Sequence, residues 1–428
     1  MFFSRRFFPY FVVQCLGALN DNVYKNVLLL MIAWASLDSL PMSVDLFVNL
    51  AAALFILPFL IFSAHAGHLA DSRDKAWLIR RLKWIELLLM GAGALAILTQ
   101  SYLAMLGLLF LMGTQSAYFG PVKYALLPQS LAPGELVQGN AWVEVGTFMA
   151  ILGGTLGAGL IMSAFEAQTI SAVAVVAFAL LGLIASQFIP SLPPLGEVTE
   201  RKGNWQILKS VKSQKQIFIA ILAISWFWFA GAIYLTQFPN FTRSELFATP
   251  AVVSLLLALF SLGIGTGSFL SVKLARGKVE LGLVALGALG LMLFGCALDA
   301  SLMWVNPPAE GSYTLGAFAA TGAHWWLLGS LFMVGVSGGI YIVPLYSFIQ
   351  AEARPAERAQ VIAANNIFNA LFMIGSAALA IVLLEVFGWS IPEFFLLIAL
   401  ANLLVISLLY IGSVHFRLAF VKYLFRRA

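Results

Sequence analysis

The chain has 428 residues, of which 61% are hydrophobic and only 10% are charged, and its mean hydropathy is +0.94. This composition excludes a soluble globular domain and predicts an all-α, polytopic membrane protein whose apolar surface faces lipid. The formal net charge is +5, and the two cysteines, Cys15 and Cys296, lie in apolar stretches that suggest neither a disulfide nor a metal site.

Apolar runs of about 17 to 25 residues are long enough to cross a bilayer, and the sequence divides into twelve of them. The predicted spans are 8–36, 44–68, 78–99, 102–127, 136–164, 169–190, 216–240, 250–275, 279–298, 323–350, 358–387 and 391–413. The polar stretch 191–215 has a Pro pair and mixed charges, which is typical of a linker. We therefore expect one six-helix bundle over 1–190, a second over 216–413, and a basic cytoplasmic tail over 414–428.

Lysine and arginine are concentrated in alternate loops. They are Arg5, Arg6, Arg73, Lys75, Arg80, Arg81, Lys83, Arg201, Lys202, Lys209, Lys212, Lys215, Lys273, Arg276, Lys278, Arg354, Arg358, Arg417, Lys422, Arg426 and Arg427. Only Lys25, Lys123 and Arg243 fall elsewhere. Because cytoplasmic loops carry the excess of basic residues, this distribution predicts that both termini are cytoplasmic in a multi-pass protein of the cell membrane.

The first predicted span carries a polar stripe near its middle, formed by Asn20, Asp21, Asn22, Lys25 and Asn26. A charged side chain at the bilayer centre costs about 2.5 to 3.5 kcal/mol on insertion scales, so the stripe is expected to face protein or a wet cavity. Asp21 and Lys25 are one helical turn apart, and this spacing would allow each to neutralise the other. A polar stripe on a spanning helix predicts a functional site.

The loop after the second span contains Gly67, Asp71, Arg73 and Lys75. This order resembles the loop signature of the major facilitator superfamily, in which a Gly allows close helix approach and an Asp is followed by basic residues. The pattern suggests a cytoplasmic gate at the helix ends. A plain basic loop is the alternative, but such a loop would need neither Gly67 nor Asp71.

Lys123 follows Gly120 and Pro121 near the end of the fourth span. A compact ammonium group suits a phosphate, and Lys123 is therefore a candidate ligand for one. The alternative is that its side chain extends to the membrane interface without a specific partner.

Asn140 and Glu144 lie one turn apart on the fifth span, and a carboxylate at that depth needs a partner. The partner would be either a lysine, in a fixed ion pair, or the ammonium group of a substrate. Asn365 and Asn369 repeat the spacing in the second half without charge. The stretches that lead to these two pairs also share a Pro-containing turn, so the two bundles are expected to be pseudo-symmetric repeats.

Signatures of enzymes are absent from the sequence. There is no Gly-x4-Gly-Lys-Ser/Thr run for nucleotide hydrolysis, and none of the four histidines has an Asp four positions later, as an embedded acyltransferase site would. We therefore expect a transporter rather than an enzyme, with no cofactor and no metal.

Four stretches together resemble the bacterial lysophospholipid transporter family, a branch of the major facilitator superfamily. They are LGALNDNVYKN, GHLADSRDKAWLIR, FGPVKYALLPQ with GNAWVEVGTF, and VIAANNIFN. The likeness runs over nearly the whole chain and is greatest for the form often fused ahead of a 2-acylglycerophosphoethanolamine acyltransferase. One departure concerns the seventh span, where stand-alone members carry a basic residue and this chain has Tyr234, Thr236 and Gln237.

The resemblance implies a monomeric flippase that moves lysophosphatidylethanolamine and lysophosphatidylglycerol from the outer to the inner leaflet of the bacterial inner membrane. An acyltransferase would be its partner. The candidate substrate residues are Asp21, Asn22, Lys25, Lys123, Asn140, Glu144, Asn365 and Asn369, and the candidate gating residues are Gly67, Asp71, Arg73 and Lys75. Two alternatives remain: a proton-coupled exporter of amphipathic drugs, with Asp21 or Glu144 as the proton carrier, and a non-transporting membrane scaffold for an acyltransferase.

Overall fold

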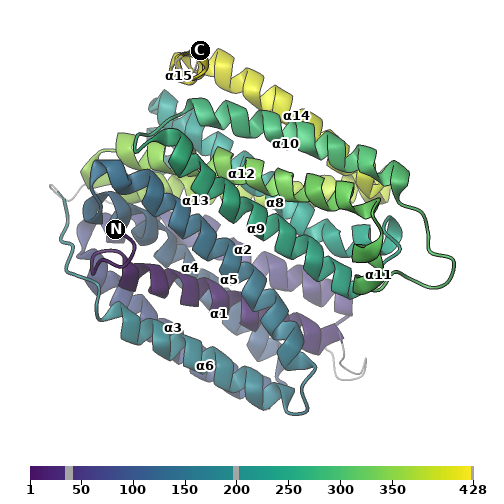
Figure 1. Cartoon of the computed structure of the whole chain (residues 1–428). Coiled ribbons are helices and arrows are strands. Elements are labelled where there is room, and N and C mark those ends of the chain that lie inside the picture. The colour runs from purple at the N-terminus through teal and green to yellow at the C-terminus, as the bar shows by residue number, and fades with distance from the viewer. Residues whose placement is uncertain (34–41, 196–201, 426–428) are drawn as a thin grey trace. The chain divides into compact units, whose positions relative to one another are not determined.

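The computed structural model describes residues 1–33, 42–195 and 202–425, and helices make up most of this part of the chain (Figure 1). The helices are α1 (Phe8–Ala33), α2 (Val44–Ser72), α3 (Lys75–Leu98), α4 (Tyr102–Ser130), α5 (Leu136–Met162), α6 (Ala167–Ser186), α7 (Asn204–Ser213), α8 (Lys215–Ser244), α9 (Pro250–Ala275), α10 (Gly282–Ser301), α11 (Leu315–Ala320), α12 (His324–Glu352), α13 (Arg358–Ala380), α14 (Ile391–Gly412) and α15 (Val414–Phe425). Arg201, Arg426 and Arg427, three of the predicted loop and tail cations, lie outside the described residues.

Ten helices in the described part of the chain are long and apolar enough to cross a membrane, which confirms a multi-pass membrane protein. The helices α1 and α3 are 26 and 24 residues long but do not meet this criterion. Both carry polar residues inside an apolar run: the stripe around Asp21 in α1, and Lys83 and Glu86 in α3. The count of twelve spans therefore stays a prediction, and it depends on whether α1 and α3 also cross the membrane.

The chain folds as two compact units. The first comprises Met1–Gly139, Met149–Ser213 and Gln350–Ala370, and the second comprises Asn140–Phe148, Gln214–Ile349 and Leu371–Ala428. Helices α5 and α13 each supply residues to both units, so the predicted bundle boundaries at 190 and 216 stay predictions.

In the first unit, α3 packs against α4 and α6, α1 packs against α6, and α2 packs against α4. Its apolar core includes the buried side chains of Tyr24, Phe47, Met90 and Leu109. Tyr24 is fully buried, and its hydroxyl donates a hydrogen bond of 3.2 Å to the backbone oxygen of Met105. The hydroxyl therefore has the partner that a buried polar group requires.

A glycine brings α5 close to the polar part of α1. A Cβ atom on Gly154 would lie 2.6 Å from the Cβ of Asn22 and 3.0 Å from the backbone oxygen of Leu19. The absence of a side chain here lets the two helices approach at the level of the polar stripe, as small residues do in membrane interiors.

The turn between α2 and α3 is held by Asp74. Its carboxylate accepts hydrogen bonds from the N–H of Trp77 in the first turn of α3, from the hydroxyl of Ser191 and from the N–H of Leu192. Partial burial alone would raise the pKa of Asp74, but these three donors outweigh it and lower the pKa below its usual value. Asp74 thus joins the start of α3 to the chain that follows α6.

The predicted linker 191–215 contains the short helix α7, whose first residue bonds to the backbone of α2. The amide nitrogen of Asn204 donates to the backbone oxygen of Leu60 at 2.5 Å, and its side-chain oxygen accepts from the N–H of Ala64 at 3.2 Å. Ile207 and Val211, one turn apart, are buried. The linker is therefore fixed to the first unit at α7.

Replacing Asn204 by Ala is expected to loosen α7, because all the side-chain hydrogen bonds of Asn204 to the backbone of α2 are lost. At roughly 1 to 3 kcal/mol for groups left without a partner, amide hydrogen exchange across α7 should quicken about five- to a hundred-fold. Hydrogen exchange of the purified protein measures this, with the exposed Lys209→Ala on the same helix as control. Equal exchange in both variants would show that Ile207 and Val211 alone hold the helix.

In the second unit, α8 packs against α9 and α14, and α10 packs against α14 and α15. Aromatic side chains fill its core: the rings of Tyr234 and Phe395 are 4.7 Å apart, and that of Phe260 lies 6.0 Å from Tyr234. The indole nitrogen of Trp226 donates to Asn402 at 3.0 Å. Trp226 and Tyr234 of α8 therefore pack within the protein.

Candidate functional site

The polar stripe of α1 lies in the first unit and keeps some accessible surface. Asp21, Asn22, Lys25 and Asn26 are all partly buried. The hydroxyl of Ser116 on α4 donates to a carboxylate oxygen of Asp21 at 2.6 Å. This is a short, charge-assisted hydrogen bond, which orients the carboxylate and leaves its other oxygen with capacity to accept.

Asp21 and Lys25 do not form the direct ion pair that their spacing suggested. Within the described residues, the ammonium of Lys25 donates instead to the side-chain oxygen of Asn22, at 3.4 Å. The amide groups of Asn22 and Asn26 donate to backbone oxygens one turn earlier, at 2.8 and 2.7 Å. The amide of Asn26 also donates to the hydroxyl of Thr155 on α5, at 3.3 Å. The asparagines thus bond mainly to their own helix, and the two opposite charges remain separate.

A second pair of charges, which the sequence did not indicate as part of the site, lies behind the stripe. The ammonium of Lys83 is 2.6 Å from a carboxylate oxygen of Glu86, one turn later on α3, and the two side chains are 1% and 3% exposed. The side-chain nitrogen of Gln115 on α4 donates to the same oxygen at 3.1 Å. Lys83 is therefore a buried partner of Glu86, which corrects the prediction that it belongs to the basic loop.

Gln115 and Ser116 are adjacent on α4, so the carboxylate of Asp21 and the Lys83–Glu86 pair are joined by neighbouring hydrogen-bonding side chains. The charges of Glu86 and Lys83 both act on Asp21 across this link. Space for Lys83 comes from Gly17 of α1 and Gly182 of α6, where added Cβ atoms would lie 2.7 and 3.4 Å from its ammonium nitrogen. The buried pair of Lys83 and Glu86 is therefore next to the stripe of α1 and is connected to Asp21.

Other predicted residues of the first unit are placed as follows. Lys123 is half-buried, with its ammonium 5.1 Å from the ring centre of Tyr124. Asn365 of α13 is fully buried, and neither its amide nitrogen nor its oxygen has a hydrogen-bond partner among the described residues. Asn369, one turn later, is partly buried. A buried amide without partners is uncommon in proteins and marks a position where water or a polar ligand could bind.

Asn140 and Glu144 lie in the second unit and are fully buried. The side-chain nitrogen of Asn140 donates to the hydroxyl of Ser347 on α12 at 3.2 Å. The eight predicted substrate residues are therefore divided: six belong to the first unit, and Asn140 and Glu144 belong to the second.

The predicted gate residues meet the start of α13. The two carboxylate oxygens of Asp71 accept hydrogen bonds from the N–H groups of Ala359 and Gln360, at 2.9 and 3.0 Å. These N–H groups have no intrahelical partner at a helix start, and the carboxylate also suits the positive end of the helix dipole. The sequence identified Asp71, but its partner is backbone and carries no sequence signal.

Gly67 makes the contact with α13 possible, because an added Cβ would lie 2.7 Å from that of Ala363 and 2.9 Å from the backbone oxygen of Ala359. Lys75 is buried and acts electrostatically on Asp71, as does Arg358. Arg73 is exposed, and only its backbone N–H, which bonds to Leu69, takes part in the turn. Three of the four gate residues thus lie at one contact.

Replacing Asp71 by Ala is expected to free the first turn of α13, because two backbone donors lose their acceptor. At about 1 to 2 kcal/mol for a helix cap, hydrogen exchange at Ala359 and Gln360 should quicken roughly five- to thirty-fold. Arg73→Ala is the matched control, since Arg73 lies two residues away and is exposed. An unchanged rate in Asp71→Ala would show that the helix start is held by other contacts.

Comparison with known proteins shows which family the chain belongs to. The sequence profile of the Major Facilitator Superfamily matches residues 11–309. The chain belongs to the Major Facilitator Superfamily. Among its curated relatives, "Lysophospholipid transporter LplT" of Citrobacter koseri is 24% identical over 386 residues, covering 86% of each chain. The protein of the same name from Serratia proteamaculans is 25% identical over 395 residues, 88% of this chain and 89% of the relative.

Solved structures of Major Facilitator Superfamily transporters share the fold. The transporter FucP in the outward conformation matches with a TM-score of 0.71 at 13% identity, over 96% of this chain and 100% of FucP. The human organic anion transporter MFSD10 also gives 0.71, at 14% identity, over 94% and 99% of the two chains. These matches confirm the predicted superfamily fold.

Proposed function

We propose that the protein is a lysophospholipid transporter that works by alternating access. The observation that carries this proposal is the partly buried polar stripe of α1. The chain also matches most of the length of curated relatives that are named lysophospholipid transporters. A membrane protein retains ionised groups in a spanning helix at a cost, and such groups mark a substrate pathway.

The chemistry of the stripe fits a zwitterionic headgroup. Asp21 offers a carboxylate oriented by Ser116 to an ammonium group, while the ammonium groups of Lys25 and Lys123 suit a phosphate. Asn365 would add an amide that has both donor and acceptor capacity. The single acyl chain needs no polar partner and can stay in apolar surroundings during transport.

We further propose that lysophosphatidylethanolamine and lysophosphatidylglycerol are the cargo and that they move from the outer to the inner leaflet of the bacterial inner membrane. With both termini cytoplasmic, as the loop charges predict, the contact of Gly67 and Asp71 with α13 lies on the cytoplasmic side. Its release would open that side to deliver the headgroup. An acyltransferase would then consume the delivered lipid.

Liposomes containing the purified protein test this function. Lysophosphatidylethanolamine with a fluorescent acyl chain, added to one leaflet, should become protected from a membrane-impermeant quencher faster than in protein-free liposomes. The same liposomes, given a proton gradient and an amphipathic dye, test the rival exporter. Dye movement without lysolipid movement would contradict the proposal, and so would the absence of both together with binding to an acyltransferase, the result expected of a scaffold.

A further inference from the structure

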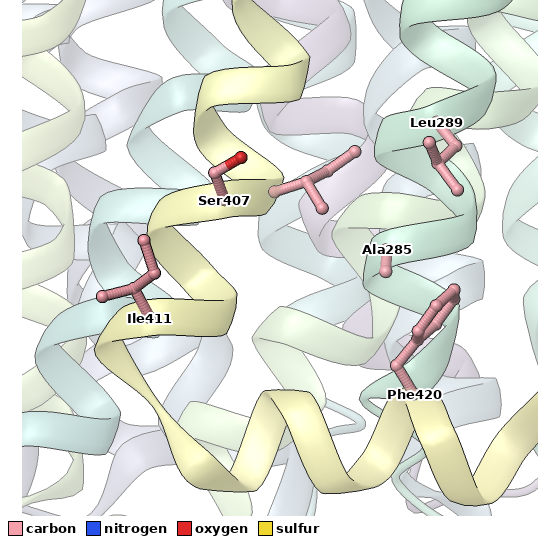
Figure 2. Close-up of a pocket in the computed structure, with 6 residues that line it drawn as sticks. Ala285, Leu289, Ser407, Ile411 and Phe420 are labelled. Carbon is pink, nitrogen blue, oxygen red and sulfur yellow. The ribbon is translucent and has the colours of Figure 1, made fainter.

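The second unit contains an apolar hollow of about 480 Å³ between α10, α14 and α15 (Figure 2). Its lining residues are Ala285 and Leu289 of α10, Ile406, Ser407 and Ile411 of α14, and Phe420 of α15. The volume lies within the range of about 300 to 1,000 Å³ that is usual for small-molecule sites. A packing gap too small to admit water adjoins it, sharing Ala285 and Ile406 and reaching Phe416.

The floor of this hollow is α15, which runs across the end of α14 after a bend at Ser413 (Figure 2). The bend is held by the hydroxyl of Ser413, which donates to the side-chain oxygen of Gln216 on α8 and accepts from the N–H of Phe416. Phe416 is buried, with its ring 6.0 Å from that of Phe348. Near its other end, α15 meets Gly282 of α10, where an added Cβ would lie 2.7 Å from the Cβ of Tyr423. The helix is therefore fixed at both ends, with Phe420 at the hollow between them.

The outer surface of α15 has the character of a helix that lies in a membrane interface. Leu418 and Val421 are 48% and 40% exposed, beside the exposed cations Arg417 and Lys422. No acidic residue occurs between Val414 and Phe425, and the turn before α10, which holds Arg276, Lys278 and Glu280, adds a net charge of +1. Exposed apolar side chains mixed with cations are typical of helices that bind anionic lipid surfaces.

We propose that this hollow binds one acyl chain of an anionic phospholipid whose phosphate is held by Arg417. Arg417 is three residues before Phe420, so the two side chains are neighbours on the helix surface, and a headgroup bonded to the guanidinium places its chain at the hollow. The lipid comes from the leaflet on the basic side of the protein, which the loop charges predict to be cytoplasmic. The site belongs to the second unit alone and does not depend on the identity of the transported cargo.

The test is lipid binding to the purified full chain in detergent, measured by native mass spectrometry with dioleoylphosphatidylglycerol and dioleoylphosphatidylcholine. We expect tighter binding of phosphatidylglycerol. Arg417→Gln should weaken phosphatidylglycerol binding about five-fold, equivalent to ~1 kcal/mol for one basic residue near the lipid surface. It should weaken phosphatidylcholine binding less, because the trimethylammonium group of choline offsets the charge of its phosphate. Ala285→Phe, which fills the hollow, should weaken binding of both lipids.

Arg243→Gln is the matched control. Arg243 is an exposed arginine in the same unit, and it lies 27 residues beyond Gln216 on α8, or about 40 Å at the rise of an α-helix. The Arg243→Gln variant should bind both lipids with the affinity of the unchanged protein. Equal affinity for the two lipids, or unchanged phosphatidylglycerol binding in Arg417→Gln, would overturn the proposal. Because Arg417 is exposed, that variant decides the question even if Ala285→Phe does not fold.

Discussion

Replacing Lys83 by Met is expected to destabilise the protein by about 3 to 5 kcal/mol, because it leaves the buried carboxylate of Glu86 without its counter-ion. Gln115 cannot compensate, since it supplies one neutral donor to a full negative charge. Thermal unfolding of the purified protein in detergent should therefore begin at a clearly lower temperature. The exposed Lys209→Met, which removes the same charge from α7, should leave unfolding unchanged.

The double variant Lys83→Met with Glu86→Gln separates an ion pair from ordinary packing. Removing both charges of a buried pair is often nearly neutral, because the cost of desolvating both groups disappears with them. The double variant should thus recover most of the stability that the single variant loses. If the two losses simply add, the charges of Lys83 and Glu86 are not coupled, and the lysine stabilises the protein through its packing alone.

Replacing Asp21 by Asn is expected to slow lysophosphatidylethanolamine transport roughly ten- to a hundred-fold. The change keeps the shape of the side chain but removes the charge, and a hydrogen bond to a charged group contributes about 1.5 to 3 kcal/mol. Lysophosphatidylglycerol, which has no ammonium group, should be affected less. Transport of both lipids into liposomes, measured with the fluorescent analogues, checks this difference.

Asp299→Asn is the control for this experiment, because Asp299 is a partly buried carboxylate in α10 of the second unit and outside the polar stripe. It should transport both lipids normally. Unchanged transport in Asp21→Asn would exclude a headgroup role for the stripe, whereas equal slowing of both lipids would indicate that Asp21 acts on the conformational change instead.

The sequence predicted the helical membrane fold because apolar runs of spanning length are visible without any knowledge of packing. It also identified the stripe of α1, since Asp21 and Lys25 interrupt such a run. Lys83 was misplaced for a physical reason: it follows Arg80 and Arg81 so closely that it looks like part of a basic loop. The burial of Lys83 depends on the neighbouring helices, where Gly17 and Gly182 leave space for its ammonium group. The sequence of α3 alone does not encode this burial.

Two further features also depend on contacts that the sequence of one helix does not reveal. The partners of Asp71 are backbone N–H groups at the start of α13. Every residue except proline has such a donor, so the motif identified the acceptor, Asp71, but not the residues that donate to it. The helix α7 was hidden within a polar linker, although the spacing of Ile207 and Val211 at one helical turn was a signal for it.

The space that Lys83 occupies predicts that positions 17, 83 and 182 do not vary independently among related sequences. Gly17 and Gly182 lie on different helices, and each lacks a side chain where the ammonium group of Lys83 passes. A mutation to Ala at Gly17 would displace the ammonium group of Lys83 from its place beside Glu86, and it would cost less once a shorter residue replaces the lysine. Lineages that diverge from this chain should therefore tolerate a side chain at position 17 more readily where Lys83 has been lost.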